Sequence, residues 1–150
     1  MARVTRTRTI AAPVGDVWKL VSDPHSLPRW WPRTTRVENV EGRSGERRSR
    51  WTKVLETAEG RGVRADYRCL SAAVGERYVW EQDLDGTPFE RHLKRLRVEI
   101  GLRERDGGTL VSLTEEQTLK GMSRLGSPLM RRARGEVLDE ALDGIEEAMT

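Results

Sequence analysis

The sequence has a single cysteine, Cys69, which excludes an internal disulfide and a zinc site built from several cysteines. Its two histidines, His25 and His92, lie far apart, and neither has another histidine or cysteine at metal-site spacing. There is no glycine-rich phosphate loop, no Gly-x-Ser-x-Gly elbow and no His-Glu-x-x-His motif. We therefore expect no metal and no cofactor. The cysteine content fits a reducing compartment, so we expect a cytoplasmic protein.

Long apolar runs are also absent. No stretch approaches the roughly 20 apolar residues that span a bilayer. The first residues carry charge without the apolar segment of a signal peptide, so we expect no stable membrane insertion. With 36% hydrophobic and 34% charged residues in 150 positions, the composition predicts one globular domain over residues 1–150.

The net charge is +3, and arginine far outnumbers lysine. A basic balance raises the hypothesis of a nucleic-acid partner. The arginines are scattered, however, and often alternate with strand residues, as Arg6 and Arg8 do near the N-terminus. That pattern is typical of the solvated face of a sheet, so we expect no nucleic-acid partner.

The clearest element is an amphipathic helix from about Ser127 to Met149. Apolar residues recur every four positions, with two more on one flank: Leu129, Ala133, Val137, Ala141 and Ile145, then Leu138 and Leu142. Ser127 can cap this helix, and Pro128 suits its first position. A helix of this kind must bury its stripe, and the strand-rich chain before it predicts a sheet as its partner.

The preceding chain predicts a strand over residues 2–10, two short helices and then roughly six strands. Pro13 can start the first helix, and Asp23 can cap the second. Strong turn signals at 85–88 and 106–108 separate later strands. Consecutive hairpins indicate an antiparallel sheet of about seven strands, so the predicted class is α+β with the long helix over one face.

Four stretches add a resemblance to this order of elements. They are residues 10–18, residues 23–32, Trp80-Glu81-Gln82 before a hairpin, and residues 107–111 entering the last strand. Together they resemble the helix-grip (SRPBCC/START-like) superfamily over the whole chain. That superfamily includes START-type lipid-transfer domains, birch-pollen-allergen-like proteins and bacterial polyketide cyclase/dehydrase-like proteins.

The resemblance implies a curved sheet that grips the C-terminal helix, with an apolar cavity between them. Members bind lipids, sterols, polyketide intermediates, plant hormones or quinones. A few catalyse cyclisation or dehydration, and some assist a chaperone. The fold does not select among these functions.

Strand alternation identifies residues that could line such a cavity. In the last strand one face carries Val111, Leu113, Glu115, Gln117 and Leu119, and its apolar start predicts that this face is inward. In the strand before it Leu96, Val98, Ile100 and Leu102 face the helix, which places Lys94 and His92 on the same face. The same counting groups Trp51 with Lys53 and Leu55, Tyr67 with Cys69, and Trp80 with Gln82. A slip of one residue would exchange the two faces.

Apolar walls with few polar groups are typical of a small-molecule site. Burial raises the pKa of a carboxyl group, so a buried Glu115 could donate or accept a proton, with His92 or Tyr67 polarising a carbonyl. Glu115 and His92 are therefore the predicted catalytic residues. The predicted ligand-binding residues are Trp51, Tyr67, Trp80, Gln82, Leu96, Gln117, Met122, Leu125 and Met130. Cys69 with His92 as its base is an alternative, although a lone cysteine in a strand is more often a core residue. Trp30 and Trp31 cannot both be buried easily, and one is expected at the cavity mouth.

Three functions remain open at this stage. Binding of a hydrophobic or amphipathic small molecule, such as a lipid, polyketide or quinone, comes first. A polyketide cyclase/dehydratase-type enzyme in the same cavity comes second, because catalysis needs at least two converging polar groups. A protein-interaction role such as chaperone assistance comes third and requires an exposed apolar patch. An edge strand could also pair two copies into a homodimer.

Overall fold

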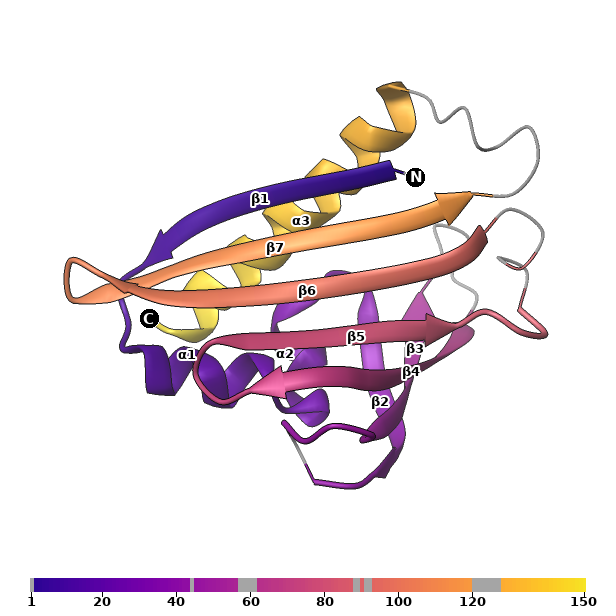
Figure 1. Ribbon diagram of the computed structural model, residues 1–150, viewed down its shortest axis with the longest axis horizontal. Helices are drawn as coiled ribbons and strands as arrows, with labels where there is room; N and C mark the ends of the chain where they lie inside the picture. Colours follow the sequence, from indigo (N-terminus) through magenta and orange to yellow (C-terminus); the bar gives the residue numbers. More distant parts are fainter. Residues whose placement is uncertain (1, 44, 57–61, 88–89, 91–92, 120–127) are drawn as a thin grey trace.

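A computed structural model describes residues 2–43, 45–56, 62–87, 90, 93–119 and 128–150, without the side chains of 128–130. The order of elements is the predicted one (Figure 1). The elements are β1 (Ala2–Ile10), α1 (Val14–Val21), the short 3-10 helix η1 (Pro24–Ser26), α2 (Leu27–Trp30), β2 (Thr34–Glu41), β3 (Arg50–Glu56), β4 (Gly62–Ala73), β5 (Arg77–Asp83), β6 (Leu93–Arg105), β7 (Gly108–Leu119) and α3 (Pro128–Ala148). Asp23 caps η1, as expected, because its side chain accepts a hydrogen bond from the His25 backbone N–H at 3.0 Å.

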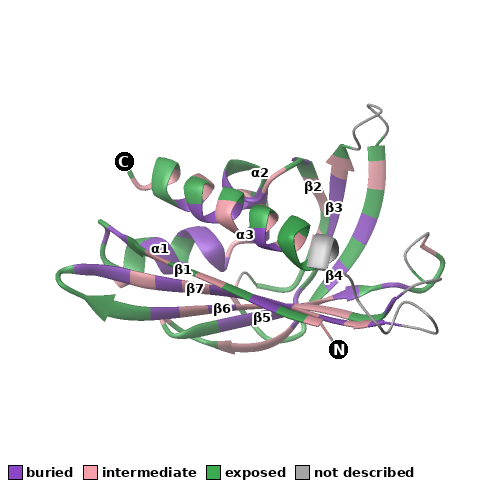
Figure 2. Cartoon of the chain, turned by 90° about the horizontal axis from the view of Figure 1, so that it is seen from above, coloured by how far each residue is buried: buried purple, intermediate pink, exposed green. Residues whose placement is uncertain are grey.

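The described strands form one antiparallel seven-stranded sheet in the order β1-β7-β6-β5-β4-β3-β2. β1 pairs with β7 along its whole length, so the first and last strands are neighbours. Figure 2 shows the helices on one side of the sheet, with β2, β3 and β4 turning up beside α3. This arrangement confirms the α+β helix-grip fold that the sequence predicts.

The C-terminal half of α3 supplies the apolar side chains that are fully buried against the rest of the molecule. Its fully buried side chains are Leu138, Ala141, Leu142 and Ile145. Two glycines allow a close approach: a Cβ on Gly144 would lie 2.3 Å from the Trp30 carbonyl oxygen, and one on Gly135 would lie 2.3 Å from Nη2 of Arg6. The N-terminal half is less covered, with Ala133 exposed and Val137 half-buried. The apolar stripe is therefore divided between a packed half and an open half.

The face of β1 that carries Arg6 and Arg8 differs from the expectation. Both arginines share a face with the buried Val4 and Ile10, and they reach across to the acidic side of α3. Arg6 lies 3.6 Å from Asp139, and Arg8 pairs with Asp143. The expected solvated face is wrong for these two residues, because helix carboxylates give them partners beside the core.

A β-bulge corrects the alternation expected at the start of β6. Leu93 pairs with Leu119 and Arg95 with Thr118, so Lys94 has no partner and the alternation shifts by one residue. Leu93 is buried and Lys94 is exposed, whereas strict alternation from Leu96 predicted Lys94 to face inward. The same reasoning placed His92 inward, but His92 lies outside the described residues.

Trp30 and Trp31 are both buried, which overturns the expectation that one of them stays at the surface. Their rings meet edge to face at a centroid distance of 5.5 Å. Trp31 also meets Trp80 at 5.5 Å, and Trp30 lies 6.1 Å from Trp80. Edge-to-face packing lets consecutive large rings share one apolar volume, which sequence spacing alone does not reveal.

Candidate functional site

A cavity of about 570 Å³ lies between the sheet and the open half of α3. Its walls come from the end of α2, from strands β3 to β7, and from one side of α3. The apolar part of the lining combines aromatic rings with aliphatic side chains, among them Trp31, Leu55, Trp80, Leu96 and Val98. Exposed residues of α3, Ala133, Glu136 and Glu140, also line it, so the cavity opens along the helix.

The structure brings several of the predicted site residues to this cavity. Glu115, Tyr67, Trp80, Gln82, Leu96 and Gln117 all line it. Trp51 is buried behind the wall, stacked between Tyr67 at 6.1 Å and Tyr78 at 6.3 Å, and does not line the cavity within the described part of the chain. His92, Met122 and Leu125 lie outside the described residues, as does the side chain of Met130. The functional roles assigned to all of these residues remain predictions.

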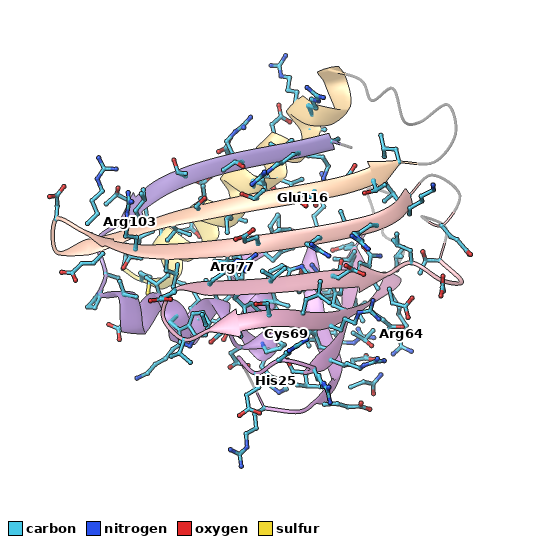
Figure 3. The ribbon with its side chains drawn as sticks, in the orientation of Figure 1. His25, Arg64, Cys69, Arg77, Arg103 and Glu116 are labelled. Carbon is cyan, nitrogen blue, oxygen red and sulfur yellow. The ribbon has the colours of Figure 1, made fainter. Side chains whose placement is uncertain are left out.

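Glu115 is buried on the inner face of β7, where alternation predicts it. Arg134 of α3 binds it with two hydrogen bonds: Nε donates to Oε2 and Nη2 donates to Oε1. Burial of Arg134 disfavours its charge, but the bonds to Glu115 outweigh this and raise the pKa of the guanidinium. Its neighbour Glu116 (labelled in Figure 3) lies on the other face of β7 and pairs with Arg3 at 3.6 Å.

Lys53 of β3 is the least expected residue of the site, because its side chain is only 2% exposed. Its Nζ lies 4.4 Å from the ring centroid of Tyr67, 4.8 Å from that of Trp31 and 5.8 Å from that of Trp80. All three rings line the cavity. Among the described residues no carboxylate lies within ion-pairing distance of Lys53. The ammonium therefore stands against aromatic faces, with the Glu115 carboxylate acting from beyond ion-pairing distance.

Burial lowers the pKa of Lys53 to about 7. The Glu115 carboxylate works against this shift, and the Arg134 cation adds to it. The cluster of Lys53, Glu115 and Arg134 thus carries one net positive charge when Lys53 is protonated and none when it is neutral. Near neutral pH the amine is present in both forms.

Two further polar groups face the same space. The Tyr67 hydroxyl donates a hydrogen bond of 3.4 Å to Oε1 of Gln82. Burial and the nearby Glu115 carboxylate raise the pKa of Tyr67, so the hydroxyl keeps its proton at neutral pH. Nε2 of Gln82 is buried without a hydrogen-bond partner among the described residues. This donor would gain a partner if the Gln82 amide turned toward a ligand oxygen in the cavity.

Sequence reasoning missed Lys53 and Arg134. The signal for Lys53 was present, since alternation places it on one face with Trp51 and Leu55, two apolar residues. Arg134 had no comparable signal, because it stands beside the apolar stripe of α3 among other arginines. Within the part of the chain that the structure describes, no three His, Cys, Asp or Glu side chains gather as a metal site would require. No described helix has the length and apolar character that a membrane crossing requires.

Comparison with known proteins identifies a matching family and several solved structures with the same fold. The family described as polyketide cyclase / dehydrase and lipid transport matches residues 1–150. No curated protein matches the chain. A START superfamily protein from Mycobacterium smegmatis is 17% identical, with a TM-score of 0.77 over 98% of this chain and 96% of that chain. A protein of known structure from Thermus thermophilus, TTHA0849, is 23% identical, with a TM-score of 0.73 over 97% and 95% of the two chains.

A third similar structure is the di-domain ARO/CYC StfQ from the steffimycin biosynthetic pathway. It is 14% identical, with a TM-score of 0.76, and the match covers 98% of this chain and 50% of that chain. At these identities the solved structures show a shared fold.

Proposed function

The chain belongs to the polyketide cyclase/dehydrase and lipid-transport family, and from this premise we propose that it binds a hydrophobic or amphipathic small molecule in the sheet–helix cavity. The cavity itself is the observation that carries the proposal. Its volume of about 570 Å³ falls in the range of small-molecule sites, and its walls are mostly apolar with a few polar groups. Lipids, polyketides and quinone-like molecules fit such a site, because each has a largely apolar body and a few polar groups.

The distribution of polar groups supports an amphipathic ligand. Lys53 and Nε2 of Gln82 both carry donors that no described acceptor takes up, and both residues line the cavity. The aliphatic wall is made by Leu55, Leu96 and Val98. An oxygen-bearing end group would pair with the donors, while an apolar body would cover the aliphatic wall.

A second function is favoured by the convergence of Lys53, Tyr67 and Glu115 in one cavity. An enzyme of the polyketide cyclase/dehydratase type needs polar groups around a carbonyl, and this cavity offers them. Glu115 is held by Arg134 through both oxygens, so it would exchange protons only after that pair opens. The role of His92 in such a reaction remains a prediction.

Chaperone assistance receives less support. It requires an exposed apolar patch. Among the described residues, Val74 stands out as the exposed large apolar side chain, and a single residue forms no patch. We also propose a cytoplasmic location, which the buried free thiol of Cys69 fits. The edge strands β1 and β2 are the surfaces through which a homodimer would form.

Native mass spectrometry of the protein purified from its own host tests binding directly. A stoichiometric lipid, quinone or polyketide that is released on denaturation would establish the ligand class. The measurement is repeated after incubation with a panel of these compounds, because a ligand can be lost during purification. If both experiments give only the mass of the chain without a ligand, the proposal is contradicted. A protein-interaction role would then be the favoured function.

A further inference from the structure

Lysine is rare in this chain, and one of its four lysines is in the cavity. Lys19 and Lys94 are exposed, as is usual for this residue type. Lys53 is buried at the centre of β3, between strands β2 and β4. A buried lysine is costly unless it is paired, and this cost calls for an explanation.

No carboxylate of the described residues completes an ion pair with Lys53. Glu115 is the carboxylate whose charge acts on Lys53, but both of its oxygens are taken by Arg134. Arg134 also adds a second positive charge to the same cavity. A lysine that is desolvated by apolar walls and stands near another cation is the setting in which an amine becomes nucleophilic.

The position of the amine is equally suited to reaction with a ligand. Nζ lies within 6 Å of the centroids of three rings, those of Tyr67, Trp31 and Trp80, and each ring forms part of the cavity wall. Lys53 itself lines the cavity beside these rings, so a molecule bound against them lies next to this residue. Gln82 lies on the same wall with its Nε2 buried and unpaired, and a rotation of its amide would bring that donor to a ligand oxygen.

We propose that Lys53 is a nucleophile that condenses with the aldehyde or ketone group of a hydrophobic ligand to form an imine. The inference rests on the proposed function, because the carbonyl compound must first occupy the cavity. It narrows the ligand class from apolar molecules in general to those with a reactive carbonyl, such as a long-chain aldehyde, a ketone or a polyketone. It also assigns a reason for burying this lysine among aromatic rings.

The step balances without an outside oxidant or reductant. The Nζ lone pair attacks the carbonyl carbon, the C=O π electrons move to oxygen, and a proton passes from nitrogen to that oxygen. The resulting hydroxyl takes one more proton and leaves as water while the C=N bond forms. Loss of the remaining N–H proton returns the borrowed proton, so one amine and one carbonyl give one imine and one water.

Residues that line the cavity can serve each part of this step. The Tyr67 hydroxyl is protonated at neutral pH and lines the cavity, so it can lend and recover the proton. After a rotation of its amide, Gln82 can hold the carbonyl oxygen through Nε2. The rings around Nζ exclude water, which slows hydrolysis of the imine.

The test uses the full-length protein at neutral pH with methyl octyl ketone and sodium cyanoborohydride, which reduces an imine to a stable secondary amine. Peptide mapping then compares Lys53 with the exposed Lys19 and Lys94 in the same sample. We expect labelling of Lys53 to exceed that of an exposed lysine by about tenfold or more, since an ordinary lysine amine with a pKa of about 10.4 is almost fully protonated there. Lys53→Met should remove the label, and Lys94→Met should leave it unchanged.

A parallel calorimetric titration with decanol, which cannot form an imine, separates the two proposals. If decanol binds and Lys53 is labelled no more than Lys19, the imine is overturned while the binding function stands. If decanol does not bind and no label forms, both fall. Should Lys53→Met fail to fold, the comparison with Lys19 and Lys94 in the unchanged protein still decides the outcome.

Discussion

Arg134 of α3 holds both carboxylate oxygens of Glu115 of β7, and this pair bridges the helix and the sheet across the cavity. The bridge ties down the half of α3 that lacks apolar cover, while the other half is held by buried leucines. It also occupies the carboxylate that could have neutralised Lys53. One ion pair thus supports an open cavity and leaves its amine without an anionic partner among the described residues.

We expect Glu115→Gln to destabilise the protein by about 1–3 kcal/mol, because Arg134 would lose its carboxylate while two-thirds buried. Urea unfolding measures the change in free energy. The adjacent Glu116→Gln is the matched control, since Glu116 pairs on the outer face with a well-exposed Arg3. That variant should change stability by no more than about 0.5 kcal/mol. Equal losses in both variants would show that the bridge does not hold the helix.

Lys53→Met should stabilise the protein at acidic and neutral pH. The pKa of Lys53 is lowered in the folded state, so the unfolded chain binds the extra proton between about pH 7 and the usual lysine range. The penalty is full below about pH 7 and is relieved as pH rises, at up to roughly 1.4 kcal/mol per pH unit. Among the described residues, the titratable and charged groups that face Lys53 are Tyr67, Glu115 and Arg134.

Thermal unfolding at about pH 6 and about pH 9 measures this dependence. The stability gain of Lys53→Met over the natural protein should be larger at the lower pH by on the order of a few kcal/mol. Lys94→Met serves as the control, because Lys94 is exposed. A gain that is the same at both pH values would mean that Lys53 does not titrate in this window.

The two glycines of α3 should respond differently to the same substitution. At Gly144 a Cβ would meet the backbone of Trp30 at 2.3 Å from its oxygen and 2.7 Å from its Cα, and backbone cannot move aside without shifting α2. At Gly135 the obstacle is the end of the Arg6 side chain, which can rotate away. We expect Gly144→Ala to cost about 1–3 kcal/mol.

Gly135→Ala, in contrast, should be neutral or stabilising by up to about 1 kcal/mol, because alanine favours a helix interior more than glycine does. Chemical unfolding of both variants provides the comparison. A larger loss at Gly135 than at Gly144 would contradict the packing of α2 against α3.

Val137→Phe should block the cavity without removing a packing contact, since Val137 is half-buried on the open side of α3 and lines the cavity. We expect decanol to bind at least about tenfold more weakly, which corresponds to about 1.4 kcal/mol. The matched control is Val74→Phe, which makes the same change at a residue that is 80% exposed. Calorimetric titration measures both. Undiminished binding to Val137→Phe would place the ligand elsewhere.

Much of the fold was predictable because local patterns and tertiary structure agree. Every second residue of β7 from Val111 to Leu119 is buried, so its inner face, including Glu115, follows from the sequence. The C-terminal helix begins within one residue of its expected start because Ser127 and Pro128 mark it clearly. Residues that are close in the chain carry enough information for these elements.

The site was less predictable because its essential contacts join distant strands to a helix. The bulge at Lys94 depends on the pairing register of β6 with β7, and the residue types at that position do not predict it. Arg134 becomes a cavity residue only through the angle at which α3 crosses the sheet. Alternation groups Lys53 with apolar residues on one face of its strand. Because lysine is rarely buried, that grouping alone did not predict a buried lysine in the site.

The indole rings of this protein have an optical consequence. Trp30, Trp31 and Trp80 pack with centroids 5.5 to 6.1 Å apart, and Trp51 lies 6.1 Å from Trp80. Rings at such separations pass excitation energy to one another before they emit, so the four respond as a group. Trp31 and Trp80 also face the cavity. A ligand that contacts either ring will alter the fluorescence of the whole group. Intrinsic tryptophan fluorescence therefore reports whether the cavity is occupied.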